Sequence, residues 1–286
     1  MEFRTIVDTA GPGFRIDPCE EMLFVGSCFA DSIGRRFQEE QFRATVNPYG
    51  VMYNPASILH TVQRLALEAP RPWRTACLTL GTNHVYRLKT TGEIVDNCQK
   101  RPQVLFTEEE LTIEECASCL TTTVDALRRI SPAVRILLTV SPIRYRKYGY
   151  HASQLSKAVL LLASDQVVKA HSTDEATVAY FPAYEIVNDE LRDYRFYKPD
   201  MLHPSDQAVE YIWERLSDCC LSDAAKAFVK DWAPLKAVLR HRPFNPGSDD
   251  YRRLIAQTMQ KIKALEEKYP TFIYHAQPDI YNDTIR

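Results

Sequence analysis

The sequence predicts an α/β fold: a mostly parallel sheet of five strands covered by helices on both faces, the three-layer α/β/α arrangement. Three observations predict it. Short apolar runs alternate with longer amphipathic stretches over the first 220 residues. Small polar residues follow directly after four of these runs. From about residue 221 the alternation stops, and only helical patterns remain.

The apolar runs are the predicted strands, and they cover 22–26, 42–46, 76–81, 134–140 and 177–182. Helical patterns cover 29–41, 56–68, 108–130 and 152–170, and a small hairpin is expected over 84–96 with its turn near Gly92. Pro55 precedes the second helix, and the third stops before Pro132. Right-handed crossovers then bring the carboxyl ends of the strands to one edge, where ligands bind.

Two amphipathic stretches, 221–240 and 248–268, form the C-terminal part, separated by the helix-breaking segment 241–250. The second has one apolar stripe, made by Leu254, Ile255, Met259, Ile262 and Leu265. We therefore expect an α/β domain over 1–220 and a helical extension over 221–286. The extension packs on that domain or on another subunit, so a homo-oligomer is one expectation.

Composition excludes several classes of protein. The formal net charge of -2 gives no reason to expect a nucleic acid or an anionic membrane as partner. No apolar run approaches the roughly 18 residues of a membrane span, and none near the N-terminus is typical of a signal peptide. Eight cysteines without an export signal indicate reduced thiols in the cytoplasm. No ligand cluster indicates a metal, and no motif indicates an organic cofactor.

Gly26, Ser27 and Cys28 stand between the first predicted strand and the first predicted helix. A tight turn there presents a nucleophile at the end of the sheet. We predict Ser27 as that nucleophile and expect Cys28 to pack inward as a small apolar residue. The alternative interpretation is that Gly-Ser only forms a turn and caps the helix.

Asp200 and His203 precede a helix that begins near Pro204. An Asp that accepts the Nδ1 proton of His leaves Nε2 free to act as a base. With Ser27 this predicts a Ser-His-Asp triad in the chain order Ser, Asp, His. A helix cap and a surface histidine are the structural alternative.

An acyl-transfer site also needs donors for the oxyanion. The backbone N–H of Ser27, the backbone N–H of Gly50 and the side-chain amide of Asn83 are the predicted donors. Gly50 has a structural alternative, a turn with positive φ, and Asn83 has another, a turn cap. Four residues after strand ends or in the following helix are candidates for substrate binding: Asn47, Ser141, Arg144 and Lys157. A solvated charged loop is the alternative for the basic ones.

Several motifs together resemble the GSCFA domain family, which is related to the SGNH (GDSL-like) hydrolases. They are "GSCFADSIG", "NPYGVMYNP", "LTVSPIRY" and "YFPAYEIVNDELRDYRFYKPDMLHPS". The resemblance covers most of residues 1–245 and implies an SGNH-type, flavodoxin-like α/β/α fold, with Ser27, Asp200, His203, Gly50 and Asn83 in the roles given above. Gln99 and Tyr145 stand where the resemblance leads us to expect histidines, which predicts a different specificity.

The sequence thus predicts a cytoplasmic serine esterase or deacylase that needs no cofactor. Its expected partner is a small-molecule or carbohydrate ester. An acyltransferase with the same triad is the alternative within enzymes, and a glycan- or ligand-binding module without catalysis is the alternative outside them.

Overall fold

The computed structural model describes residues 4–9, 11–68, 71–96, 98, 101–171 and 178–274. The chain divides into two compact units. The first comprises the chain up to Ile16 together with Glu20–Leu221. The second comprises Asp17–Cys19 and the chain from Ser222 onward. The two units are described separately below.

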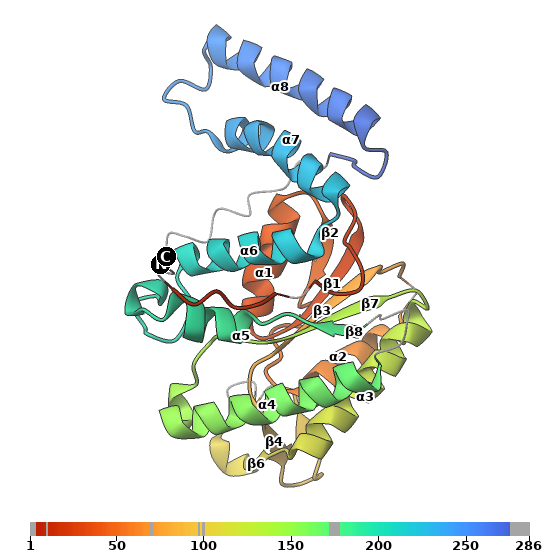
Figure 1. Ribbon diagram of the computed structural model, residues 1–286, viewed down its shortest axis with the longest axis vertical. Helices are drawn as coiled ribbons and strands as arrows, with labels where there is room; N and C mark the ends of the chain where they lie inside the picture. The colour runs from red at the N-terminus through yellow and green to blue at the C-terminus, as the bar shows by residue number, and fades with distance from the viewer. Residues whose placement is uncertain are drawn as a thin grey trace. The chain divides into compact units, whose positions relative to one another are not determined.

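A parallel sheet of five strands is the centre of the first unit (Figure 1). Its strands are β1 (Glu21–Gly26), β2 (Arg43–Val46), β3 (Thr75–Leu80), β7 (Arg135–Val140) and β8 (Val178–Tyr180), in the spatial order β2-β1-β3-β7-β8. All four pairings are parallel, and Phe24 lies opposite Val46 on one side and Cys77 on the other. The strand order reverses between β1 and β3, so this is the topological switch point of the sheet.

Helices cover both faces of this sheet (Figure 1). One face carries α1 (Cys28–Glu39) and α6 (Asp206–Cys220), and the other carries α2 (Pro55–Leu65), α3 (Ile113–Ile130) and α4 (Tyr150–Ala170). The fold is therefore a three-layer α/β/α sandwich, as predicted. Shorter helical segments are η1 (Gln103–Leu105), η2 (Arg146–Tyr148), α5 (Ala183–Glu185), η3 (Ile186–Leu191) and η4 (Tyr194–Phe196).

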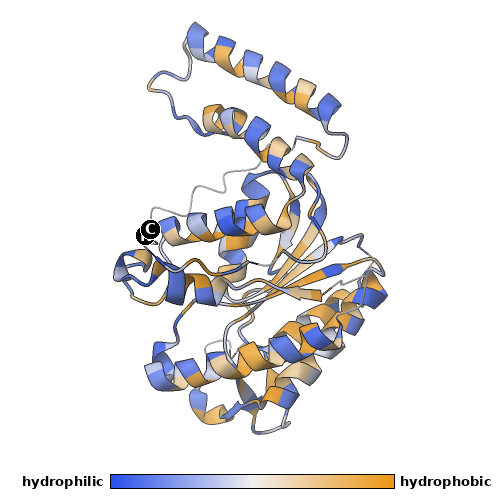
Figure 2. Cartoon of the chain, in the orientation of Figure 1, coloured by the Kyte–Doolittle hydropathy of each residue, from blue (hydrophilic) through white to orange (hydrophobic). Residues whose placement is uncertain are grey.

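Apolar side chains fill the space between the layers, and the strands are the most hydrophobic part of this unit (Figure 2). On the α1 face, Phe37 packs between Phe24 and Trp213, with ring centroids 5.2 Å and 4.8 Å away. On the other face Leu23 and Val25 of β1 belong to a larger cluster with α2, α3 and α4. Burial on both faces explains why the strands have continuous apolar runs instead of alternating patterns.

A second sheet of three antiparallel strands, in the order β5-β4-β6, follows β3. Its strands are β4 (His84–Leu88), β5 (Ile94–Val95) and β6 (Phe106–Glu110). The hairpin over 84–96 was predicted, but the helical prediction for 108–112 is wrong. Three consecutive glutamates there extend along β4, where Glu109 binds Arg87 at 3.0 Å. Pairing with β4 prevails over the helix propensity of glutamate.

The second unit contains α7 (Asp223–Arg240) and α8 (Asp249–Lys268). Phe228 and Trp232 of α7 pack with Ile262, Leu265 and Phe272 around a small core of their own. Cys19 belongs to this core, and Pro18 accepts a hydrogen bond from Thr271 Oγ1 at 3.0 Å. Three residues near the N-terminus therefore complete a unit that otherwise belongs to the C-terminal part of the chain.

Across the described ranges, each helix is either too short or too polar to span a bilayer.

Candidate active site

The carboxyl edge of the sheet at the switch point lies where β1 leads into α1 and β3 ends at Leu80. Gly26 is required there because its φ is +147° and an added Cβ would collide with the Thr79 backbone of β3. Doubly wound sheets bind ligands at this position. The residues that follow Gly26 therefore lie where a ligand is expected.

Ser27 is fully buried and is the N-cap of α1. Its Oγ accepts the N–H of Phe29 at 3.2 Å and lies 3.2 Å from Thr79 Oγ1. The Ser27 hydroxyl thus has the cap role that was named as its alternative, and its assignment as the nucleophile stays a prediction. The residue at the end of the strand turns its side chain back over the first helical turn, where it satisfies a free backbone donor.

Cys28 is the first residue of α1, and its side chain is partly exposed. Its Sγ lies 3.7 Å from the hydroxyl of Tyr53. The expectation that Cys28 packs inward is wrong, because the Ser27 cap directs the next side chain outward at the helix N-terminus. Within the described residues the Cys28 N–H has no hydrogen-bond acceptor.

Asp200 and His203 form the predicted pair, with Oδ2 of the aspartate 2.6 Å from Nδ1 of the histidine. Asp200 Oδ1 accepts the backbone N–H groups of Leu202 and His203 at 2.8 and 3.0 Å. These hydrogen bonds, that from the His203 backbone first, lower the pKa of Asp200 to about 2. The aspartate is thus ionised and fixed, and the geometry leaves Nε2 of His203 as the basic nitrogen.

Contacts between loops bring this pair toward the edge where Cys28 lies. The N–H of Arg144, after β7, donates to the Leu202 carbonyl at 3.1 Å, and the Arg144 side chain donates to the Met201 carbonyl at 3.3 Å. The next residue, Tyr145, packs edge-on against Tyr53 with ring centroids 6.0 Å apart. Among the described residues, however, no hydrogen bond joins His203 to Cys28 or to Ser27.

The three predicted oxyanion donors are all engaged elsewhere. The Ser27 N–H donates to Thr79 at 3.0 Å, the Gly50 N–H to the Asn47 carbonyl at 2.9 Å, and Asn83 Nδ2 to the Leu111 carbonyl at 2.8 Å. Gly50 has a φ of +91°, which is the turn role named as its alternative. Each of these three groups thus has an internal acceptor in this structure, and their role as oxyanion donors stays a prediction.

Lys157 is fully buried, and its Nζ donates to the carbonyls of Gly81 and Ser141 at 2.6 and 2.8 Å. Burial lowers the pKa of this amine to about 7. Ser141 is also fully buried. Both residues hold together the ends of β3 and β7 and are inaccessible to substrate, contrary to the prediction.

Asn47 is also structural, because Oδ1 accepts the Gly26 N–H at 2.9 Å and Nδ2 donates to Asp31 at 2.6 Å. Arg144 lines a cavity of about 250 Å³. That cavity also has Gln154, Asn188, Tyr194 and Tyr197 in its wall.

Two tyrosines were missed as candidates. Tyr53 lies beside Cys28, and burial together with the hydrogen bond to Cys28 raises its pKa to about 12, so it stays protonated. Tyr145 is half-buried, and its hydroxyl, next to Gly81, is buried without a hydrogen-bond partner among the described residues. The sequence motif that contains Tyr145 does not indicate its contact with Tyr53, because that contact forms only in the folded chain. Gln99, the other expected departure, lies outside the described residues.

Comparison with known families agrees with the motifs in the sequence. The model of the GSCFA family matches residues 21–75 and 71–216, and that of the GSCFA domain protein, C-terminal domain, matches 232–277. The chain belongs to the GSCFA family. No curated protein matches this GSCFA chain in sequence.

Three solved structures resemble the GSCFA chain weakly. A carbohydrate esterase of family 3 from Talaromyces cellulolyticus is 12% identical, with 74% of this chain and 99% of that chain covered and a TM-score of 0.40. A family 3 carbohydrate esterase from Clostridium thermocellum is 14% identical; 73% of this chain and 98% of that chain are covered, and the TM-score is 0.39. A variant acetyl-xylooligosaccharide esterase from Geobacillus is 11% identical; 73% of this chain and 98% of that chain are covered, and the TM-score is 0.42. These scores are too low to transfer an activity, and the names describe those proteins alone.

Proposed function

We propose that this protein is an acyl hydrolase in which Cys28, not Ser27, is the nucleophile, His203 the general base and Asp200 the residue that positions His203. One observation carries the proposal: a partly exposed thiol begins α1 at the switch point of the sheet, while Ser27 is buried as the cap. The Asp200–His203 pair on a loop anchored to Arg144 supplies the base.

The reaction begins when Nε2 of His203 accepts the proton of the Cys28 thiol. The positive end of the α1 dipole stabilises the resulting thiolate. Sulfur then attacks the ester carbonyl, and the oxyanion accepts hydrogen bonds from the Cys28 N–H and the Tyr53 hydroxyl. His203 protonates the leaving alcohol, and the acyl group stays on Cys28. Water, deprotonated by His203, hydrolyses this thioester and releases the acid and the free thiol.

His203 and Cys28 are not hydrogen-bonded in this ligand-free structure, so the mechanism requires them to approach when substrate binds. Catalytic hydrogen bonds are often loose without substrate and tighten in the complex. The His203 side chain is 39% exposed, which leaves it room to rotate toward Sγ. The proposed substrate is a small acyl ester, with a polar carbohydrate as the alcohol part. Transfer to a hydroxyl acceptor would use the same groups.

The test is hydrolysis of p-nitrophenyl acetate by the full chain and three variants. Cys28→Ala should lose kcat/KM by at least about 10³-fold, because no other nucleophile is placed there. Cys28→Ser should retain a small residual rate. Ser27→Ala should keep most of kcat per folded molecule but unfold more easily, because the cap stabilises the helix by about 1 kcal/mol.

Labelling adds a second readout. Iodoacetamide should modify Cys28 first and abolish activity, and peptide mass spectrometry identifies the modified thiol. If Cys28→Ala stays active while Ser27→Ala is inactive and folded, the nucleophile is Ser27 and the proposed assignment fails. Mass analysis of products formed with added sugar acceptors distinguishes transfer from hydrolysis.

A further inference from the structure

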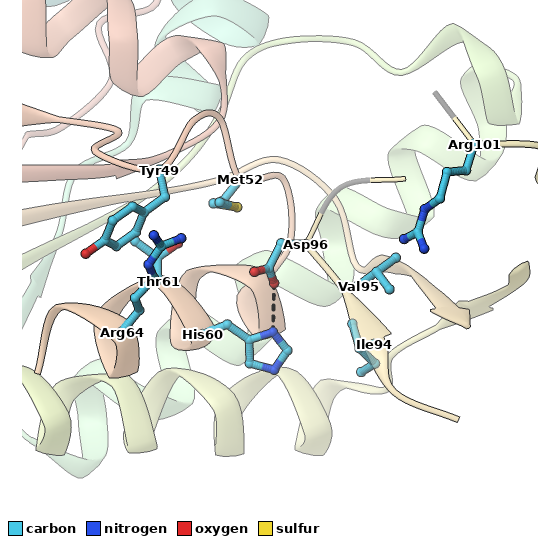
Figure 3. A pocket seen from close by; sticks show the side chains of 9 residues that line it. All are labelled: Tyr49, Met52, His60, Thr61, Arg64, Ile94, Val95, Asp96 and Arg101. Carbon is cyan, nitrogen blue, oxygen red and sulfur yellow. Dashed lines mark hydrogen bonds and ion pairs between the residues drawn. The ribbon is translucent and has the colours of Figure 1, made fainter. Parts of the chain in front are cut away.

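A second cavity, of about 350 Å³, lies in the first unit between α2, β5 and the loop over 47–54 (Figure 3). It contains none of the residues assigned above to the reaction. The residues that line it are Tyr49, Met52, His60, Thr61, Arg64, Ile94, Val95, Asp96 and Arg101. Three of these residues, His60, Arg64 and Arg101, carry basic side chains.

Two guanidinium groups face this cavity. Arg64 lies over the ring of Tyr49 at 3.8 Å, and Arg101 lies over the ring of Phe106 at 4.9 Å. Neither arginine forms an ion pair with a carboxylate of the described residues. Figure 3 shows the two on opposite sides of the His60–Asp96 pair. Aromatic stacking thus holds each cation. Arg101 Nε also donates to the Cys98 carbonyl at 3.3 Å, while the terminal N–H groups of both arginines have no acceptor among the described residues.

Asp96 supplies the single carboxylate among the residues that line the cavity, and His60 Nδ1 binds it at 2.7 Å. This hydrogen bond raises the pKa of His60, which favours the imidazolium. The two arginines outnumber this single carboxylate, so the cavity has a net positive charge in either state of His60. The imidazolium form of His60 presents Nε2–H as a further donor.

Thr61 provides an independent observation. It is 2% exposed, it lines the cavity, and its hydroxyl has no hydrogen-bond partner. A buried hydroxyl without a partner costs free energy, so such groups are rare unless a ligand or water satisfies them. The group that would complete this site therefore forms a hydrogen bond with this hydroxyl, and a phosphate oxygen can accept that bond.

We propose that this cavity binds a phosphate group of a small organic phosphate, held between Arg64 and Arg101 and hydrogen-bonded by Thr61. Phosphate fits better than carboxylate because its three terminal oxygens and charge near −2 match two guanidinium forks, a hydroxyl and an imidazole N–H. The proposal does not depend on the acyl chemistry at Cys28, since none of these residues takes part in it.

Calorimetric titration of the full chain with inorganic phosphate at pH 7 and constant ionic strength tests this. We expect saturable one-site binding that Arg64→Gln and Arg101→Gln each weaken by at least about tenfold. Thr61→Val should weaken it less. Arg129→Gln is the matched control, because Arg129 is an exposed arginine of α3 that does not line the cavity; it should bind like wild type.

Circular dichroism establishes whether each variant is folded. If Arg64→Gln does not fold, the phosphate affinity of Arg101→Gln tests the proposal. No saturable phosphate binding, equal binding by the arginine variants and wild type, or acetate binding as tightly as phosphate would each overturn the proposal. None of these readouts requires turnover, so a failure here is distinct from a failure of the esterase assay.

Discussion

Lys157 shows at the scale of one residue how the sheet edge is stabilised. Its nitrogen meets two backbone carbonyls, and no carboxylate of the described chain forms an ion pair with it. A neutral amine has two N–H groups, which match two acceptors without leaving a charge buried. This agrees with the direction in which burial moves its pKa, down to about 7.

Lys157 should therefore make the protein more stable as pH rises. Between the folded pKa near 7 and the ordinary value of 10.5, the unfolded chain holds a proton that the folded chain lacks. The free energy of unfolding then increases with pH across this interval. Urea unfolding at pH 7, 8 and 9 measures it. Lys157→Met should lose this increase and, at pH 9, be less stable by about 1–3 kcal/mol, because two carbonyls lose their donor. Equal pH slopes in both proteins would contradict the assignment.

Asp200→Asn is expected to reduce kcat and leave KM and folding nearly unchanged. Asparagine retains an oxygen for the N–H groups of Leu202 and His203. It cannot accept the Nδ1 proton as a carboxylate does, so His203 loses its basic tautomer. The loss in kcat should lie between about tenfold and 10⁴-fold.

The matched control for Asp200→Asn is Asp165→Asn, an exposed carboxylate of α4 paired with Lys169 at 2.7 Å. It should keep wild-type kcat. Full activity in Asp200→Asn, with an unchanged pH profile, would mean that Asp200 only shapes the turn.

The proposed triad differs from the predicted one by one residue, Cys28 in place of Ser27. The sequence indicated the strand, the turn and the helix correctly, and Asp200 with His203 as a pair. It could not indicate which of two adjacent side chains caps the helix, because serine at the N-cap and serine as nucleophile have the same local pattern. The internal acceptors of Gly50 and Asn83, the carbonyls of Asn47 and Leu111, depend on the folded chain in the same way, so no local pattern indicates them.

At the scale of elements, α1 packs unusually close to the sheet at Gly34. A Cβ added there would lie 2.6 Å from Val46 Cγ2 and 3.1 Å from Phe24 Cγ. Valine is stiff at χ1, so the contact is not easily relieved. The absence of a side chain at Gly34 thus allows α1 to lie this close to β1 and β2.

Gly34→Ala is therefore expected to destabilise the protein by about 1–3 kcal/mol through overpacking. In an exposed helix the same change would stabilise by about 0.5–1 kcal/mol. Combining it with Val46→Ala should recover part of the loss, which a double-mutant cycle in urea measures. Additive effects of the two changes, or a gain in stability from Gly34→Ala alone, would show that the contact is not limiting.

The sequence predicted most strands and helices of the fold within a few residues, because β1, β3 and β7 are continuous apolar runs between amphipathic helices. It failed at β6, whose glutamates have neither an apolar run nor a clear alternation. The register of such a strand is set by its partner β4, and no local pattern specifies it. The strand predicted over 177–182 corresponds to β8, Val178–Tyr180, and residue 177 lies outside the described residues.

At the scale of the whole molecule, the order β2-β1-β3-β7-β8 places the ends of β1 and β3 at the switch point. This much follows from alternating strands and helices with right-handed crossovers. The phosphate cavity does not follow from it. That cavity depends on the loop over 47–54 and the hairpin after β3 meeting α2, and on the stacking of two arginines on aromatic rings.

The short segment Asp17–Cys19 has a consequence for synthesis of the chain. The ribosome makes it more than two hundred residues before its packing partners, from Phe228 to Phe272. Until these partners emerge, Cys19, which is 1% exposed in the folded protein, has no core to enter. A chain truncated after residue 221 would therefore leave that thiol uncovered, so α7 and α8 protect a cysteine that precedes the first strand of the sheet.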